Sequence, residues 1–197
     1  MDLEMTGLNP VKDRILEVGL IVTDFDFNEL ATYEAVIFQE PSTLERLKQS
    51  DWYEYSNGKR VKKGSVYGMT QKSGLLARIS TGKPESQVEQ EIAKLIQDNF
   101  DQLAILSGNS IHQDRKFIRT WWPRVETLLH YRMLDVTSFK IWMQGKYGQE
   151  FRKPDQHRAL EDIRGSIQEL GYYLRKLPKY LEDSNAASED EDKVASI

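Results

Sequence analysis

The sequence predicts an α/β domain in which strands and helices form layers around one core. Two observations indicate this class. Strand-like patterns dominate the first 40 residues, whereas beyond residue 84 short apolar segments alternate with segments whose apolar residues recur at helical spacing. The chain has 197 residues, of which 39% are hydrophobic, and this is enough to bury one such core. Early strands followed by alternating strands and helices are typical of an α/β layered domain.

The first part of the chain is predicted to form three strands. Residues 2–5 form a short strand, and the apolar run at 15–22 leads into a turn at 24–28, which indicates a β-hairpin. The alternating segment 31–40 predicts a third strand that ends before Pro41. We expect the leading acidic strand to lie centrally in the sheet. The basic, glycine-containing segment 57–68 is expected to be a mobile surface loop.

The second part of the chain predicts alternating helices and strands. A helix over 84–100 follows the start signals Pro84 and Ser86. The segment 103–110 is a short buried strand that ends in a glycine turn, and the helix after it is interrupted near Pro123. The segment 130–147 predicts a strand and then a helix. A final amphipathic helix is predicted within 157–177.

We expect one domain over residues 1–180 and an acidic, disordered tail over 181–197. From residue 182 on, the chain has six acidic residues, one lysine and no aromatic residue, too little apolar surface to offset the entropy of ordering. The absence of cysteine excludes disulfides and thiolate metal sites. A net charge of −4 argues against broad affinity for duplex DNA. No segment approaches the roughly 20 apolar residues of a membrane span, so no membrane partner is expected.

Acidic residues stand at four places where a strand or helix would present them. Asp2 and Glu4 are two positions apart on the first strand and therefore share a face. Asp114 stands near the start of a helix, and Asp162 lies on the last helix, five residues after His157. Carboxylates in such numbers suit hard cations such as Mg²⁺ or Mn²⁺. Two such ions can activate a water molecule and stabilise the leaving oxygen of a phosphodiester.

Four motifs make the chain recognisable: DLEMTGL, SGNSIHQD, HYRMLDV and HRALEDI, in this order. Together they resemble the oligoribonuclease family, a branch of the DEDDh 3′→5′ exonucleases, over residues 2 to about 177. The resemblance implies an RNase H-like fold, with a mixed sheet flanked by helices. It also implies a 3′→5′ exoribonuclease that degrades short RNA oligonucleotides, chiefly diribonucleotides, to 5′-mononucleotides by two-metal-ion hydrolysis.

The resemblance implies a role for each matching residue. Asp2, Glu4, Asp114 and Asp162 would bind two Mg²⁺ or Mn²⁺ ions, and His157 would be the general base. An imidazole, with an ordinary pKa near 6.5, can accept a proton at neutral pH.

Five further residues match positions that bind substrate in the family. Leu8 would wedge between the two bases, Trp52 would stack on a base, and Ser110 would bind on the 5′-phosphate side. Tyr131 and Arg132 would reach into the site of a partner subunit, which implies a homodimer. A pocket capped in this way suits substrates of two to a few nucleotides.

Several alternatives remain open from the sequence. Each acidic residue alone could be an ordinary solvated or helix-start residue, and His157 alone could be a surface histidine. The enzyme could act on longer DNA or RNA 3′ ends. The chain could also bind dinucleotides without turnover, because the first strand begins directly after Met1 and could lack its leading half. We expect a cytoplasmic location, or a mitochondrial one in a eukaryote.

Overall fold

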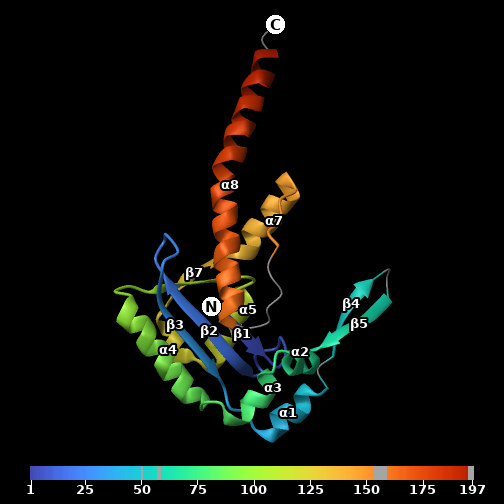
Figure 1. Ribbon diagram of the computed structural model, residues 1–197, viewed down its shortest axis with the longest axis vertical. Coiled ribbons are helices and arrows are strands. Elements are labelled where there is room, and N and C mark those ends of the chain that lie inside the picture. The colour runs from blue at the N-terminus through green and yellow to red at the C-terminus, as the bar shows by residue number, and fades with distance from the viewer. Residues whose placement is uncertain (50, 57–58, 153–158, 195–197) are drawn as a thin grey trace.

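The computed structural model describes residues 1–49, 51–56, 59–152 and 159–194 (Figure 1). Its first three strands pair antiparallel, in the order in which they occur along the chain. They are β1 (Asp2–Met5), β2 (Ile15–Thr23) and β3 (Glu29–Val36). The tight turn between β2 and β3 is closed by Asp24, whose carboxylate accepts hydrogen bonds from the backbone and side chain of Asn28. This is the hairpin that the sequence predicts.

Two further strands form a separate parallel pair, β6 (Ala104–Gly108) and β7 (Leu129–Asp135). The amino group of Met1 donates a hydrogen bond to the carbonyl of Ser107, at 2.9 Å, which brings β6 beside the start of β1. A side chain on Gly108 would come within 2.7 Å of the Met1 carbonyl oxygen, so only glycine allows this approach. Among the described strands β1 pairs with β2 and is the edge strand of the three-stranded sheet, so the expected central position is not confirmed, because the contact with β6 is made by Met1, before β1 begins.

Helices flank the sheet on both faces, which confirms the predicted α/β class. The apolar side of β1, β2 and β6 packs with β3 against α4, α5 and α6 to form the main core. α8 lies against β2 and β1 (Figure 1). The helices are α1 (Pro41–Leu47), α2 (Val66–Lys72), α3 (Leu75–Arg78), α4 (Glu85–Asn99), α5 (His112–Trp121), α6 (Pro123–Thr127), α7 (Val136–Tyr147) and α8 (Ala159–Val194), with a 3₁₀ turn at Ile79–Thr81.

The structure corrects one expectation about the basic segment. Instead of a loop over 57–68, the chain forms an antiparallel hairpin of β4 (Asp51–Ser56) and β5 (Lys59–Ser65), followed by α2. The hairpin projects from the side of the domain (Figure 1). The sequence holds a signal for it, because an Asn-Gly pair between segments that contain aromatic and β-branched residues favours a two-residue hairpin turn.

The end of the chain also differs from the expected disordered tail. The backbone of α8 continues as helix to Val194 and extends beyond the body of the domain (Figure 1). The acidic segment is free of glycine and contains alanine, glutamate and lysine, which are good helix formers, so helix is compatible with its composition. The domain boundary at residue 180 stays a prediction. None of the described helices is both long enough and apolar enough to span a membrane.

Candidate active site

β1 turns two carboxylates away from the core. Leu3 is buried in the main core, so its neighbours Asp2 and Glu4 face the opposite side of the sheet. In register, Asp2 lies opposite Gly19 and Glu4 lies opposite Glu17 of β2. Both side chains are half-buried. The strand pattern thus places the two acids together on the face of the sheet opposite the main core.

Asp114 reaches this strand from α5. It lies in the first turn of the helix, where the positive end of the helix dipole favours an acid, and only 5% of its surface is exposed. The backbone N–H of Leu3 donates a hydrogen bond of 2.9 Å to Asp114 Oδ1. This bond ties the start of α5 directly to β1 between the two acids of the strand.

Asp162 comes to the same face from α8. This helix can approach β2 because Gly19 has no side chain: a Cβ there would lie 2.8 Å from Ala159 Cβ and 2.9 Å from Ile163 Cδ1. Asp162 is half-buried in the same turn of the helix. Its charge is among those that raise the pKa of Glu4, so it lies close to the strand acids.

The four carboxylates repel one another in a partly buried site. Burial, together with the charges of Asp2, Glu17, Asp162 and Asp114, raises the pKa of Glu4 to about 7. Burial, followed by the charge of Asp2, likewise raises the pKa of Asp114 to about 7. The four acids that the sequence singled out are therefore brought together, although they come from three elements far apart in the chain.

The chemistry of these donors fits divalent cations. Oxygen-rich, negatively charged groups are the ligands that Mg²⁺ and Mn²⁺ prefer, and a cation would offset the repulsion that raises the two pKa values. Within the described ranges, no three acidic or histidine side chains already stand together closely enough to hold an ion. Binding would therefore require the carboxylates to turn toward a common point.

Ser110 lies in a strained turn between β6 and α5. Its φ of 50° is in the left-handed region, which is uncommon for a residue with a side chain. Its N–H donates to Asp135 Oδ1 and to Thr137 Oγ1, each at 2.9 Å. The Asp135 carboxylate also caps α7 by accepting from the N–H of Thr137. The Asp135 carboxylate thus holds Ser110 in place at the start of α7.

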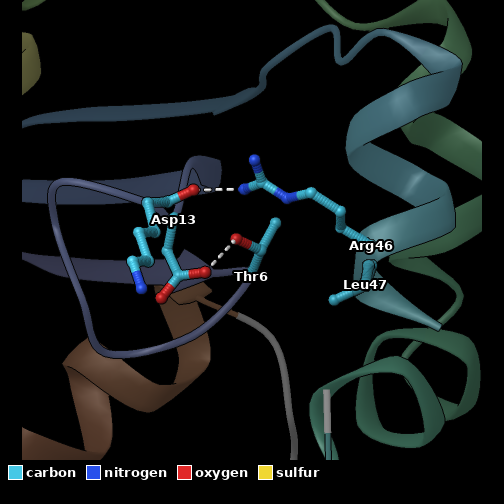
Figure 2. Close-up of a pocket in the computed structure, with 5 residues that line it drawn as sticks. Thr6, Asp13, Arg46 and Leu47 are labelled. Atoms are coloured by element: carbon cyan, nitrogen blue, oxygen red, sulfur yellow. Dashed lines mark hydrogen bonds between the residues drawn. The ribbon is translucent and has the colours of Figure 1, made fainter. Parts of the chain in front are cut away.

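Leu8 stands on the loop that follows β1, and 70% of its surface is exposed. A cavity of about 340 Å³ opens between this loop and α1 (Figure 2). In Figure 2, Thr6 Oγ1 donates to Asp13 Oδ1 at 3.1 Å, and Arg46 donates to the backbone carbonyl of Lys12. The loop that carries Leu8 is thus braced at its base and presents an exposed apolar side chain.

The structure describes only part of the remaining predicted site residues. His157 lies outside the described residues. The backbone of Trp52 is described, in β4 opposite Gly64, while its side chain lies outside the description. Tyr131 and Arg132 are exposed on β7, and Arg132 lies over the Tyr131 ring at 5.0 Å. β7 pairs with β6 in a sheet separate from that of β1, which carries Asp2 and Glu4.

Sequence reasoning missed two buried acids near the site. Glu17 is 4% exposed on β2, beside Glu4, and its Oε1 accepts from Arg78 Nη1 at 2.9 Å. Glu169 is 1% exposed on α8 and accepts a hydrogen bond from Tyr173. The hairpin pairing of 2–5 with 15–22 could have indicated Glu17, because it puts a second acid opposite Glu4. The position of Glu169 gives no comparable signal.

Comparison with known proteins identifies the family of the chain. The RNase T family model, described as an exonuclease, matches residues 1–51 and 71–170. An oligoribonuclease of Francisella tularensis subsp. tularensis (strain WY96-3418) is 37% identical over 181 residues, covering 90% of this chain and 93% of the relative. The oligoribonuclease of Chromobacterium violaceum is 35% identical over 179 residues, covering 88% and 91%. Residues 52–70, between the two matched segments, contain most of the β4–β5 hairpin.

Proposed function

This chain belongs to the exonuclease family, in its oligoribonuclease branch, and on that premise we propose that it degrades short RNA from the 3′ end. The substrates are oligonucleotides of two to a few residues, chiefly diribonucleotides, and the products are 5′-mononucleotides. The observation that carries the proposal is the convergence of Asp2, Glu4, Asp114 and Asp162 at β1, with the pKa of two of them raised to about 7. A cluster of mutually repelling acids has little structural use without a cationic ligand.

The four acids would hold two Mg²⁺ or Mn²⁺ ions. When bound, such ions lower the pKa of a water molecule and stabilise the leaving oxygen of the phosphodiester. The chain orients the carboxylates through the bond from Leu3 N–H to Asp114 and through the close approach of α8 at Gly19. His157, directly before α8, would accept the proton of the attacking water.

Substrate would lie along the edge of the loop that follows β1. Leu8 is exposed there and is suited to separate two bases, and the neighbouring cavity of about 340 Å³ is large enough for a small polar ligand. Trp52 would stack on a base, an interaction worth roughly 1–3 kcal/mol. Ser110 would contact the 5′-phosphate side from its strained turn.

We also propose that the enzyme is a homodimer, in which Tyr131 and Arg132 complete the site of the partner. An exposed apolar surface supports this arrangement. It is formed by Ile105 of β6 and by Tyr131 and Met133 of β7, which are exposed on two paired strands. Light scattering should give a dimer. Mixing Tyr131→Ala with Asp162→Ala subunits should restore activity, because one of the two sites in each mixed dimer has all its residues.

One assay tests the activity. Purified protein should hydrolyse a 5′-phosphorylated diadenylate with Mg²⁺ and lose this activity with EDTA. Asp162→Ala should be inactive. The control Glu161→Gln, which changes the neighbouring acid on the same helix, should retain activity. Undiminished hydrolysis by Asp162→Ala would sink the site assignment.

The same preparation separates the alternatives. Faster cleavage of a 20-mer than of the dinucleotide would favour an enzyme for longer 3′ ends. Tight dinucleotide binding without product would favour a binding protein. We place the activity in the cytoplasm, or in mitochondria if the organism is a eukaryote, and a fluorescent fusion of the chain would check this.

A further inference from the structure

A buried carboxylate on α8 joins two segments that are far apart in the chain. Glu169 lies seven residues, about two helical turns, after Asp162 and is 1% exposed. Its Oε1 accepts from the Tyr173 hydroxyl at 3.1 Å, and its Oε2 accepts from Asn109 Nδ2 at 3.4 Å. Each oxygen is thus used by a different element. This acid has no part in the proposed reaction.

On one side, the network holds the turn that carries Ser110. Asn109 Nδ2 donates to Ser166 Oγ at 2.8 Å, and Ser166 Oγ donates to the Asp162 carbonyl at 2.9 Å. The Thr137 hydroxyl donates to Asn109 Oδ1 at 3.4 Å. The turn at 109–110 is therefore bonded both to the start of α7 and to the part of α8 that bears Asp162.

On the other side, the network holds the chain beyond α7. The Tyr173 ring is fully buried, and its hydroxyl accepts a hydrogen bond from the N–H of Phe151 at 3.4 Å. One hydroxyl thus links Glu169 to the backbone of a separate segment. Beyond Phe151 the chain leads to His157 and then to α8.

We propose that Glu169 and Tyr173 are positioning residues for the reaction. They hold the Asn109–Ser110 turn and the backbone at Phe151 at set positions relative to α8, and so relative to Asp162. This inference rests on the proposed function, since the segments matter only if Ser110 and His157 act on substrate. Neither residue contacts the reacting atoms, so their loss affects turnover through the groups that they place.

The sharpest variant is Tyr173→Phe, which removes one hydroxyl and keeps the buried ring. We expect kcat on the dinucleotide to fall by about 10- to 100-fold, because displacements near 1 Å can cost about 100-fold, with little change in KM. Hydrogen exchange of the Phe151 amide should accelerate. The matched control is Tyr33→Phe, which removes another tyrosine hydroxyl bonded to a glutamate, Glu91, at 2.5 Å on a different part of the domain. This control should keep both kcat and the Phe151 exchange rate.

A second pair keeps the inference testable if Tyr173→Phe folds poorly. In Glu169→Gln the side-chain oxygen can still accept from Tyr173, so kcat should fall less than in Glu169→Met, which has a similar volume and no oxygen acceptor. This ranking tests the hydrogen bond, because both variants keep most of the side-chain volume.

Unchanged kcat and unchanged Phe151 exchange in Tyr173→Phe would overturn the inference while leaving the enzyme activity intact. An equal fall of kcat in Tyr33→Phe would overturn it as well. If the unmodified protein fails to hydrolyse the dinucleotide, the proposed function fails first. The Phe151 exchange rate would then still report whether Tyr173 holds that segment.

Discussion

Two groups of buried polar side chains lie two turns apart on α8, and they are built in opposite ways. Around Asp162, the acids of β1 and α5 raise the pKa of Glu4 and of Asp114 to about 7. Around Glu169, hydroxyl and amide donors from Tyr173 and Asn109 meet the carboxylate oxygens. The first group stores repulsion that a cation can relieve, and the second is satisfied by the protein itself.

The difference indicates how the helix serves the site. The acid cluster concentrates negative charge, and the repulsion lowers the stability of the folded protein. The Glu169 network stabilises the fold, because its hydrogen bonds join α8 to the turn at 109–110 and to the backbone at Phe151. Removal of a negative charge should therefore raise the folding stability at the acid cluster and lower it at the Glu169 network.

The largest effect is expected from removing one charge of the acid cluster. Glu4→Gln should lower kcat with Mg²⁺ by roughly a thousandfold or more, because it removes a ligand oxygen charge needed in the transition state. Without metal, its free energy of unfolding at pH 8 should equal or exceed that of the unmodified protein, because one repelling carboxylate is gone. Urea unfolding with EDTA checks the second part. A clear loss of stability would contradict the view of this cluster as repulsive.

Metal binding should stabilise the protein through the same cluster. Saturation at about 100 times Kd adds about 2.7 kcal/mol, which for a domain of this size corresponds to a rise in Tm of about 5–10 °C. Thermal unfolding with Mg²⁺, Mn²⁺ and EDTA measures the rise. Asp2→Asn should abolish most of it, whereas Glu169→Gln should keep it. Equal rises in all three proteins would place the ion elsewhere.

A smaller effect is expected at the edge of the acid cluster. Arg78→Met removes the guanidinium that donates to buried Glu17, and should cost about 1–3 kcal/mol in unfolding free energy, reduced by the solvent access of Arg78. The exposed pair Arg164–Glu29, with contacts of 2.9 Å, is the matched control. Arg164→Met should cost less than Arg78→Met, because solvent screens the exposed pair. Similar costs in the two variants would show that burial of Glu17 has no effect on the pair.

The smallest effect concerns Glu91, a half-buried carboxylate outside both groups. Hydrogen bonds from Lys83, Tyr33 and Gln87 lower the pKa of Glu91 to about 2. Because the folded pKa lies below the ordinary value of 4.5, the stabilisation is complete above about pH 4.5 and is lost as the pH falls toward 2. Glu91→Gln should flatten this part of the stability curve. Urea unfolding at pH 3 and pH 7 measures it, and an unchanged slope would contradict the assignment.

Much of the fold follows from local patterns in the sequence. The alternation at 2–5 and the helical spacing at 84–100 predict β1 and α4 because side-chain periodicity is a local property. The same holds for the break at Pro123, where α5 ends and α6 begins. The basic segment is the exception, because its charged composition predicts a loop and its Asn-Gly pair is a weaker signal for the hairpin that forms.

What the sequence by itself determined is the set of acids and the elements that present them, together with their likeness to the exonuclease motifs. Only the tertiary structure decided which groups meet. Arg78 pairs with Glu17 across 61 positions, and Asn109 reaches Glu169 across 60. Such contacts depend on strand register and on the close approach of elements at Gly19 and Gly108. Periodicity carries no information about either, because it records which face a residue occupies and not which element packs against that face.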